Sequence, residues 1–289
     1  MIKKEIKIFL MSLSYFTRIP ISQKINFFDE SEISHILRYF PLIGLLIAIS
    51  SFLVFYISHI FLGITNEIAI ILSVIFSTLI TGALHEDGLA DSADGFGGGY
   101  GDKEKILQIM KDSRIGSYGA LALIFSQLLK FYSLKTISLP SSAPSSSYSS
   151  SSLSLEHLFF ALIVAHTLSR LMVFIYIFDN KNINNNNFNQ QRPNSKSQSV
   201  TASANLKDFL IAIFITITAL TCLGIFTKFS LIALAASITF ILFIYIFIKR
   251  FVNKRLVGYG YTGDVLGAIQ QIMEITIYII ISSTLIIKN

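Results

Sequence analysis

The chain has 289 residues, of which 53% are hydrophobic and only 14% charged, and its mean hydropathy is +0.64. This composition excludes an ordinary soluble domain and is typical of a polytopic membrane protein. The net charge of +6 does not indicate nucleic acid as a partner, because Lys and Arg are scattered between apolar segments and form no basic stripe. The single cysteine, Cys222, excludes an internal disulfide and a thiolate metal site.

The N-terminal segment, residues 1–16, contains basic residues among apolar ones, which predicts an amphipathic helix lying at a membrane surface. Arg18 follows in a short polar turn, and its position alone favours an ordinary interfacial cation. A short helix with acidic residues in its first turn is expected from about residue 29.

Seven apolar runs are long enough, or nearly so, to cross a bilayer. They cover residues 39–62, 67–84, 117–139, 155–178, 207–226, 229–248 and 265–287. The predicted fold is therefore an all-α polytopic membrane bundle of about seven transmembrane helices with short interfacial helices, forming one domain over residues 1–289.

Two low-complexity segments interrupt this pattern. Residues 138–154 are nearly all Ser, and residues 180–203 are rich in Asn, Gln and Ser. Neither can bury enough apolar surface to fold, so both are predicted to be disordered loops without catalytic residues.

The basic residues predict the orientation. They lie before the first run, between the second and third, after the fourth and after the sixth, and the alternate loops carry almost none. The positive-inside rule places these loops, and the acidic segment described next, on the cytoplasmic side of the inner membrane.

The segment from Thr81 to Gly119 holds the densest set of ionisable and glycine residues. Asp87, Asp91 and Asp94 are spaced i, i+4 and i+7, so a helix places them on one face. Carboxylates about 6 Å apart repel by roughly 3 kcal/mol at an effective dielectric near 20, which favours a bound cation. Oxygen ligands without Cys favour Mg²⁺ or Mn²⁺. The alternative is a solvated acidic face, and His85 is expected to point away from this face.

Glycines follow the acidic face. Gly97 and Gly98 could let backbone amides approach a phosphate, or could belong to a flexible helix end. A surface helix capped by Asp102 then returns a polar segment to the cluster. Its cations are expected to bind phosphates, the alternative being a solvated charge run.

Polar residues also occur inside the apolar runs. His166 and Arg170 share one face, and Arg170 is either functional or extends to the cytoplasmic interface. Asp264, Gln271 and Glu274 form a polar stripe on the last run, where buried polar groups need partners. The metal of the acidic cluster, or its ligand, is expected to supply them. Thr262 or Asp264 is the expected cap of this helix.

Six motifs in chain order resemble the cobalamin synthase family, adenosylcobinamide-GDP ribazoletransferase. They are FTRIP at 16–20, FPLIG at 40–44, LHEDGLADSADG at 84–95, MKDSRIGSYG at 110–119, SR at 169–170 and TGDVLGA at 262–268. The two central motifs are long and specific. Glu86 departs from the apolar residue expected there and would add a ligand or face solvent.

The resemblance implies an integral membrane, Mg²⁺-dependent enzyme that joins adenosylcobinamide-GDP to α-ribazole or its 5′-phosphate and releases GMP. The expected metal ligands are Asp87, Asp91 and Asp94. The expected catalytic residues are these three with Asp112 and His85. The expected substrate-binding residues are Lys111, Ser113, Arg114, Arg170, Asp264, Gly97 and Gly98.

Two other functions fit parts of the pattern. A CDP-alcohol phosphatidyltransferase also uses clustered aspartates and metal, but Asp91 stands where that family has Arg. A cation transporter would place its carboxylates near the membrane midplane. The sequence leaves the oligomeric state open, a homo-oligomer included.

Overall fold

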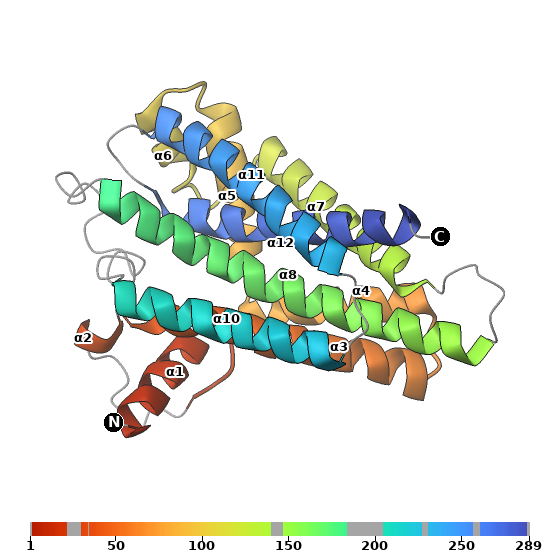
Figure 1. Ribbon diagram of the computed structural model, residues 1–289. Coiled ribbons are helices and arrows are strands. Elements are labelled where there is room, and N and C mark those ends of the chain that lie inside the picture. Colours follow the sequence, from red (N-terminus) through yellow and green to blue (C-terminus); the bar gives the residue numbers. More distant parts are fainter. Residues whose placement is uncertain are drawn as a thin grey trace.

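The computed structural model describes residues 2–21, 30–33, 35–139, 147–183, 205–226, 231–256 and 261–287, and every regular element in these ranges is a helix (Figure 1). The helices are α1 (Ile2–Phe16), α2 (Glu30–Ile33), the 3₁₀-helix η1 (Ile36–Tyr39), α3 (Phe40–Tyr56), the π-helix η2 (Ile57–Phe61), α4 (Asn66–Thr81), α5 (Leu84–Gly98), α6 (Lys103–Ile109), α7 (Ser117–Ser138), α8 (Ser147–Ile183), α10 (Leu206–Phe226), α11 (Leu231–Arg255) and α12 (Gly263–Ile287).

Six of the described helical segments are long and apolar enough to cross a membrane, and the pair α4 and α5 makes up to seven. The segments are 36–61, 117–138, 154–180, 206–225, 231–255 and 263–286. The predicted all-α polytopic membrane protein is therefore confirmed. The second predicted span is the exception, because α4 has only 16 residues and α5 leaves it at 86°.

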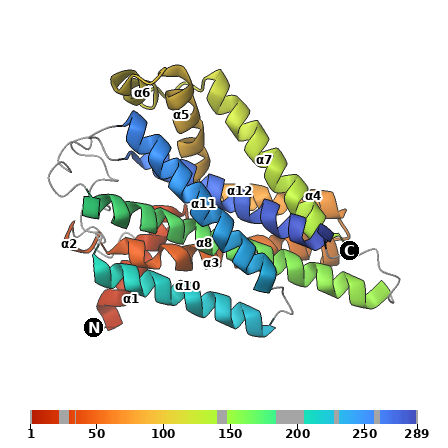
Figure 2. The ribbon, with the colours of Figure 1, turned by 45° about the horizontal axis from the view of Figure 1, so that its top comes forward.

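The bend between α4 and α5 has a local cause. Gly82 (φ +63°) and Ala83 (φ +57°) both have left-handed backbone conformations, and their amides donate to the carbonyls of Leu79 (3.0 Å) and Thr78 (2.9 Å). This pair of hydrogen bonds is the Schellman arrangement that ends a helix. The bend turns α5 sideways, and Figure 2 shows it rising away from α4 toward α6.

The centre of the bundle is formed by α8 and α12. In one 18-residue apolar stretch of each span, 83% and 72% of the residues are buried, against 17% in the corresponding stretch of α11, so α11 presents most of its apolar surface to lipid. The core around α8 and α12 is apolar and includes Phe174, Ile163, Met273 and Ile277. Packing in this core fixes the positions of the helix ends that form the site.

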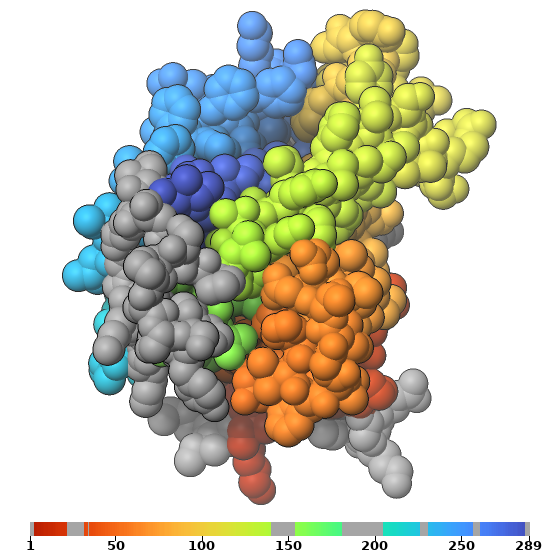
Figure 3. Space-filling model, turned by 90° about the vertical axis from the view of Figure 1, so that its right-hand side faces the viewer, coloured from red at the N-terminus to blue at the C-terminus, as the bar shows by residue number. Residues whose placement is uncertain are grey.

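The basic helix ends gather at one end of the bundle. In Figure 1, α10 and α12 begin at the left and α8 ends there, close to α1 and α6. Figure 3 shows the opposite end, where the turn between α3 and α4 lies beside α7, and Lys135 of α7 pairs with Glu67 of α4 at 3.1 Å.

The limits of α8 correct the predicted loops. It begins at Ser147 and ends at Ile183, so helix extends into both segments predicted to be disordered, 138–154 and 180–203. Extending an existing helix costs little once it has nucleated, which explains helical Ser residues next to an apolar run. Residues 140–146 and 184–204 lie outside the described residues.

The amphipathic helix predicted at the N-terminus is α1. Its apolar side buries Ile8, Met11 and Phe16 against the bundle, and the Phe16 ring stacks on Phe40 of α3 at 4.1 Å. On its polar side, Glu5 accepts hydrogen bonds from Arg38 at 3.0 and 3.1 Å. These contacts fix the wall of the pocket described below.

Candidate active site

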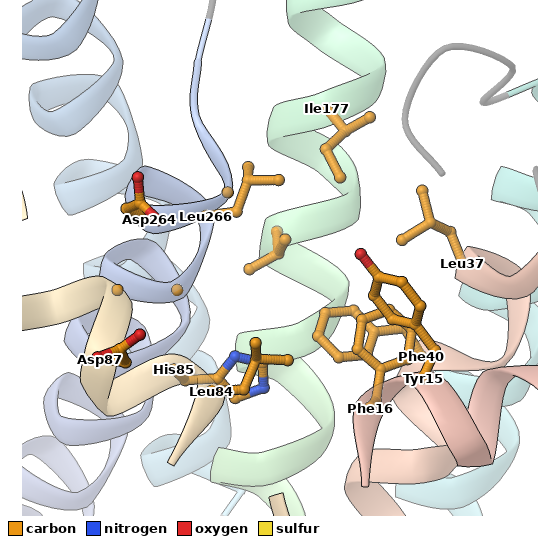
Figure 4. A pocket seen from close by; sticks show the side chains of 14 residues that line it. Tyr15, Phe16, Leu37, Phe40, Leu84, His85, Asp87, Ile177, Asp264 and Leu266 are labelled. Carbon is orange, nitrogen blue, oxygen red and sulfur yellow. The ribbon is translucent and has the colours of Figure 1, made fainter. Parts of the chain in front are cut away.

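A cavity of about 170 Å³ opens at the basic end of the bundle, where α1, α3, α5, α8 and α12 meet. Most of its wall is apolar, and its ionisable groups come from α5 and α12, with one tyrosine from α1. Figure 4 shows the lining, which includes Tyr15, Phe16, Phe40, His85, Asp87 and Asp264.

Glycines bring the two acidic residues of the pocket together. A Cβ at Gly88 of α5 would lie 3.1 Å from the Cα of Gly267 in α12, and a Cβ at Gly267 would lie 3.2 Å from the Cα of Gly88. The backbones can approach this closely only because neither residue has a side chain. As a result Asp87 and Asp264, from helices about 180 residues apart in sequence, lie on the same side of the pocket (Figure 4).

The predicted acidic helix is α5, but its three aspartates have different surroundings. Asp87 is exposed to the pocket and Asp91 is half-buried. Asp94 is buried, and its two oxygens accept hydrogen bonds from the amides of Gly116 (2.7 Å) and Gly119 (2.8 Å) at the start of α7. Asp94 therefore joins α5 to α7, and its predicted role as a metal ligand stays a prediction.

The donor set of the pocket fits Mg²⁺ in one particular way. In the described residues, no three His, Cys, Asp or Glu side chains gather closely enough to hold a metal ion by themselves. Mg²⁺ usually takes one or two carboxylates and completes its shell with water and substrate phosphates. Asp87 and Asp264 supply two carboxylates at one pocket, which suits an ion that binds together with a phosphorylated substrate.

His85 lies on the pocket although it was expected to point away from the carboxylates. It and Asp87 line the cavity from different sides of α5. The residue is 5% exposed, its ring centre lies 5.8 Å from that of Phe40, and its Nε2 has no hydrogen-bond partner in the described structure. A buried nitrogen without a partner, facing a cavity, is suited to contact a bound molecule.

The polar segment after α6 lies apart from the pocket lining. Asp102 caps α6 as predicted, accepting from the amides of Glu104 (2.9 Å) and Lys105 (3.2 Å). Beyond the helix, Asp112 and Arg114 pair with each other at 2.6 Å, and Arg114 is 87% exposed. Hydrogen bonds from Arg114 lower the pKa of Asp112 to about 2. Lys111 and Ser113 are also exposed.

Gly97 and Gly98 have a packing role in the structure. Both lie within α5, where amides hydrogen-bond along the helix. A Cβ on Gly97 would meet the ring of Tyr118 at 2.6 Å, and one on Gly98 would lie 3.1 Å from Ile109 of α6. The glycine run lets α6 and α7 pack against α5, and phosphate binding by its amides stays a prediction.

Arg170 is buried behind the pocket wall. It is 1% exposed, its guanidinium lies 5.6 Å from the centre of the Phe40 ring, and it donates to the carbonyl oxygen of His166 at 2.9 Å. It does not reach the interface, and it is absent from the pocket lining. Gly44 makes room for it, since a Cβ there would lie 2.9 Å from the Arg170 Cδ.

Gln271 and Glu274 of the polar stripe on α12 have protein side chains as partners, which corrects the expectation of a metal or its ligand for these two residues, whereas Asp264 lines the pocket. Glu274 pairs with Lys130 of α7 at 2.8 Å and with His166 of α8 at 3.3 Å. Gln271 donates to Glu86 at 3.2 Å. Glu86 is 7% exposed, so it neither faces solvent nor lines the pocket.

Lys130 is the functional-looking residue that sequence reasoning missed. It is 2% exposed in the middle of an apolar helix and lies 3.7 Å from Glu86 as well as contacting Glu274. The signal was present, because an isolated lysine inside a membrane span requires a buried partner. With Arg170, it balances the charges of the two glutamates.

The fold and the site together define a class of protein: a polytopic helical membrane protein with a carboxylate-lined pocket at the basic end of its bundle. Comparison with known proteins narrows the class. The family described as Cobalamin-5-phosphate synthase matches residues 8–282, so the chain belongs to that family. It is a membrane-embedded transferase of cobalamin biosynthesis, and the recognition made from the motifs is confirmed.

Curated relatives cover nearly all of the chain. It is similar to the adenosylcobinamide-GDP ribazoletransferase of Shewanella amazonensis, with 36% identity over 283 residues, which are 96% of each chain. The enzyme of the same name from Shewanella frigidimarina is 38% identical over 282 residues, covering 96% of this chain and 95% of the relative. No solved structure matches the chain.

Proposed function

We propose that the chain joins adenosylcobinamide-GDP to α-ribazole, or to its 5′-phosphate, and releases GMP, with Mg²⁺ as cofactor. The relatives' shared name supports the substrates. The observation that carries the proposal is the pair of carboxylates, Asp87 and Asp264, at one pocket. The family match favours this transfer over the phosphatidyltransferase and transporter alternatives.

In the proposed reaction, the ribose 3′-hydroxyl of the acceptor attacks the phosphorus nearer the corrinoid. The bond from that phosphorus to the bridging oxygen breaks, GMP leaves with that oxygen, and the hydroxyl proton passes to a base. His85 and Asp87, the ionisable residues of α5 that line the pocket, are the candidates for this base. Bound Mg²⁺ supplies positive charge next to the diphosphate.

Asp87 and Asp264 are the residues that hold Mg²⁺ in this proposal, and Asp91 lies one helical turn from Asp87. The apolar wall formed by Phe16, Phe40 and Leu266 limits water at the reacting phosphorus. A drier pocket strengthens the interaction of these charges with a diphosphate.

In this proposal the protein lies in the inner membrane and its site faces the cytoplasm. The support is the distribution of basic residues: α1, the α5 to α7 connection and the end of α11 all carry Lys or Arg at the pocket end of the bundle. A nucleotide-activated substrate is available on that side.

The test is release of GMP from adenosylcobinamide-GDP and α-ribazole 5′-phosphate by the full chain in membranes with Mg²⁺. Asp87→Asn is expected to slow release by about 100-fold or more, because it removes a metal-binding charge from the pocket. Glu104→Gln is the matched control, since Glu104 is an exposed acid on α6 that does not line the pocket. Absence of GMP release by correctly inserted wild type would refute the proposal.

A further inference from the structure

The pocket lacks a cation for a phosphorylated substrate. Its described lining contains Asp87, Asp264 and His85 but no Lys or Arg. The predicted phosphate-binding cations lie elsewhere: Arg114 is paired with Asp112, and Arg170 is buried behind Phe40. A diphosphate esterified at both ends carries two negative charges, and a third develops on GMP as the bond breaks. One divalent ion leaves that third charge uncompensated, and a cation at the rim would balance it.

Arg18 is placed at that rim by its backbone. It follows Tyr15 and Phe16, which line the pocket from α1. Its amide donates at 2.7 Å to the carbonyl oxygen of Ile80, near the end of α4. This hydrogen bond fixes the chain after α1 against the bend from which α5 starts toward the pocket.

The side chain of Arg18 is fixed by the same bend. It lies across Gly82, where a Cβ would collide with its Nε and lie 2.9 Å from its Cδ and Cγ. Gly82 precedes Leu84 and His85, which line the pocket, by two and three residues. The Arg18 side chain therefore lies at the bend between α4 and α5, next to the residues of α1 and α5 that line the pocket, although Arg18 itself is not part of the lining.

Arg18 is also available for a ligand. Its side chain is exposed, and among the described residues it makes no ion pair or side-chain hydrogen bond. Arg38, by contrast, is paired with Glu5 at 3.0 Å. An arginine held in place without a carboxylate partner keeps its planar set of donors for two phosphate oxygens.

We propose that Arg18 binds the diphosphate of the nucleotide-activated substrate at the mouth of the pocket. This inference rests on the proposed function and adds a substrate-binding residue to it. A structural reading is the competing one, because a cation near the end of α4 also stabilises the helix dipole. A phospholipid headgroup offers the same phosphate chemistry at a membrane surface.

The experiment measures GMP release against the concentration of adenosylcobinamide-GDP in phospholipid-free detergent. Arg18→Gln is expected to raise KM for this substrate by about 10- to 50-fold with kcat changed less, and Arg18→Lys to recover part of the loss. Arg250→Gln is the control, because Arg250 is an exposed arginine on α11 outside the pocket lining. An unchanged KM, or a loss of kcat alone with lower thermal stability, would overturn the proposal.

Two further measurements identify which phosphate Arg18 binds. The KM effect must persist when α-ribazole replaces α-ribazole 5′-phosphate; an effect limited to the phosphorylated acceptor assigns Arg18 to the acceptor and overturns the proposal. An effect that appears only in vesicles containing anionic phospholipid assigns Arg18 to lipid and also overturns it.

Binding of GDP with Mg²⁺, measured by calorimetry, tests Arg18 independently of turnover. The expected result is a roughly tenfold weaker affinity in Arg18→Gln than in wild type. If wild type binds GDP but releases no GMP, the reaction is wrong and Arg18 is still tested by the variant. Equal GDP affinity in both proteins would count against Arg18 alone.

Discussion

The substitution Asp94→Asn tests whether Asp94 stabilises the fold or binds the metal ion. The carboxylate accepts amide hydrogen bonds at 2.7 and 2.8 Å from Gly116 and Gly119 in a buried position. Asn keeps one acceptor and turns an NH₂ group toward the other amide. The loss of one charge-assisted hydrogen bond and the unpaired buried amide together cost about 3 to 5 kcal/mol of unfolding free energy. By the scale of soluble domains, that lowers the unfolding midpoint by about 6 to 15 °C.

The assay is thermal unfolding in detergent, followed by the Mg²⁺ dependence of GMP release. Asp94→Asn is expected to be less stable with an unchanged half-saturating Mg²⁺ concentration. Gly119→Ala should act in the same way, because a Cβ there would collide with the Asp94 carboxylate. Gly224→Ala is the control, since a Cβ at Gly224 meets nothing within 4 Å. An Asp94→Asn protein of wild-type stability that needs much more Mg²⁺ would refute the structural role.

Three further outcomes follow from the site. Chelation of divalent ions should abolish GMP release, and added Mg²⁺ or Mn²⁺ should restore it. Lys130→Met should lower the unfolding free energy by about 3 to 5 kcal/mol, because it removes the lysine that pairs with the buried Glu274 and leaves His166 as the remaining ion-pair partner. Adding Glu274→Gln should recover part of this loss, as thermal unfolding would show. Asp112→Asn should leave the pH profile of GMP release unchanged above pH 5, because the pKa of Asp112 is lowered to about 2. The ion pair of Asp112 contributes its full stabilisation above the unfolded pKa near 3.8 and loses it as pH falls through the folded pKa of about 2.

Local sequence patterns predicted the features that depend on neighbours along the chain. Length and hydropathy predicted the spans, because a bilayer requires a fixed run of apolar residues. Asp102 was recognised as the cap of α6, and Thr262 was one of two candidates for the cap of α12, where its hydroxyl accepts from the amide of Val265 at 3.2 Å. Each cap depends on residues no more than four positions away, and each span on one continuous run of the chain.

Features that join distant segments could not be predicted in the same way. The spacing of Asp87, Asp91 and Asp94 placed them on one helix face, but nothing local shows that α7 begins against Asp94. Nothing in the sequence distinguishes Gly88 and Gly267 from other glycines, and only the close contact of α5 with α12 shows why both lack a side chain. The partner of Glu274, Lys130, is 144 residues away, and only packing brings the two together.

The helix α12 connects the pocket to the buried charges. Asp264 lies in its first turn, and Glu274 follows ten residues later, about 15 Å along the axis. The ion pair of Glu274 with Lys130 thus holds α12 in register against α7, while Gly267 sets its distance from α5. A buried ion pair contributes little net stability but can specify one arrangement of helices. Because the position of Asp264 relative to Asp87 depends on that arrangement, the charges inside the membrane determine whether the two pocket carboxylates face the same ligand.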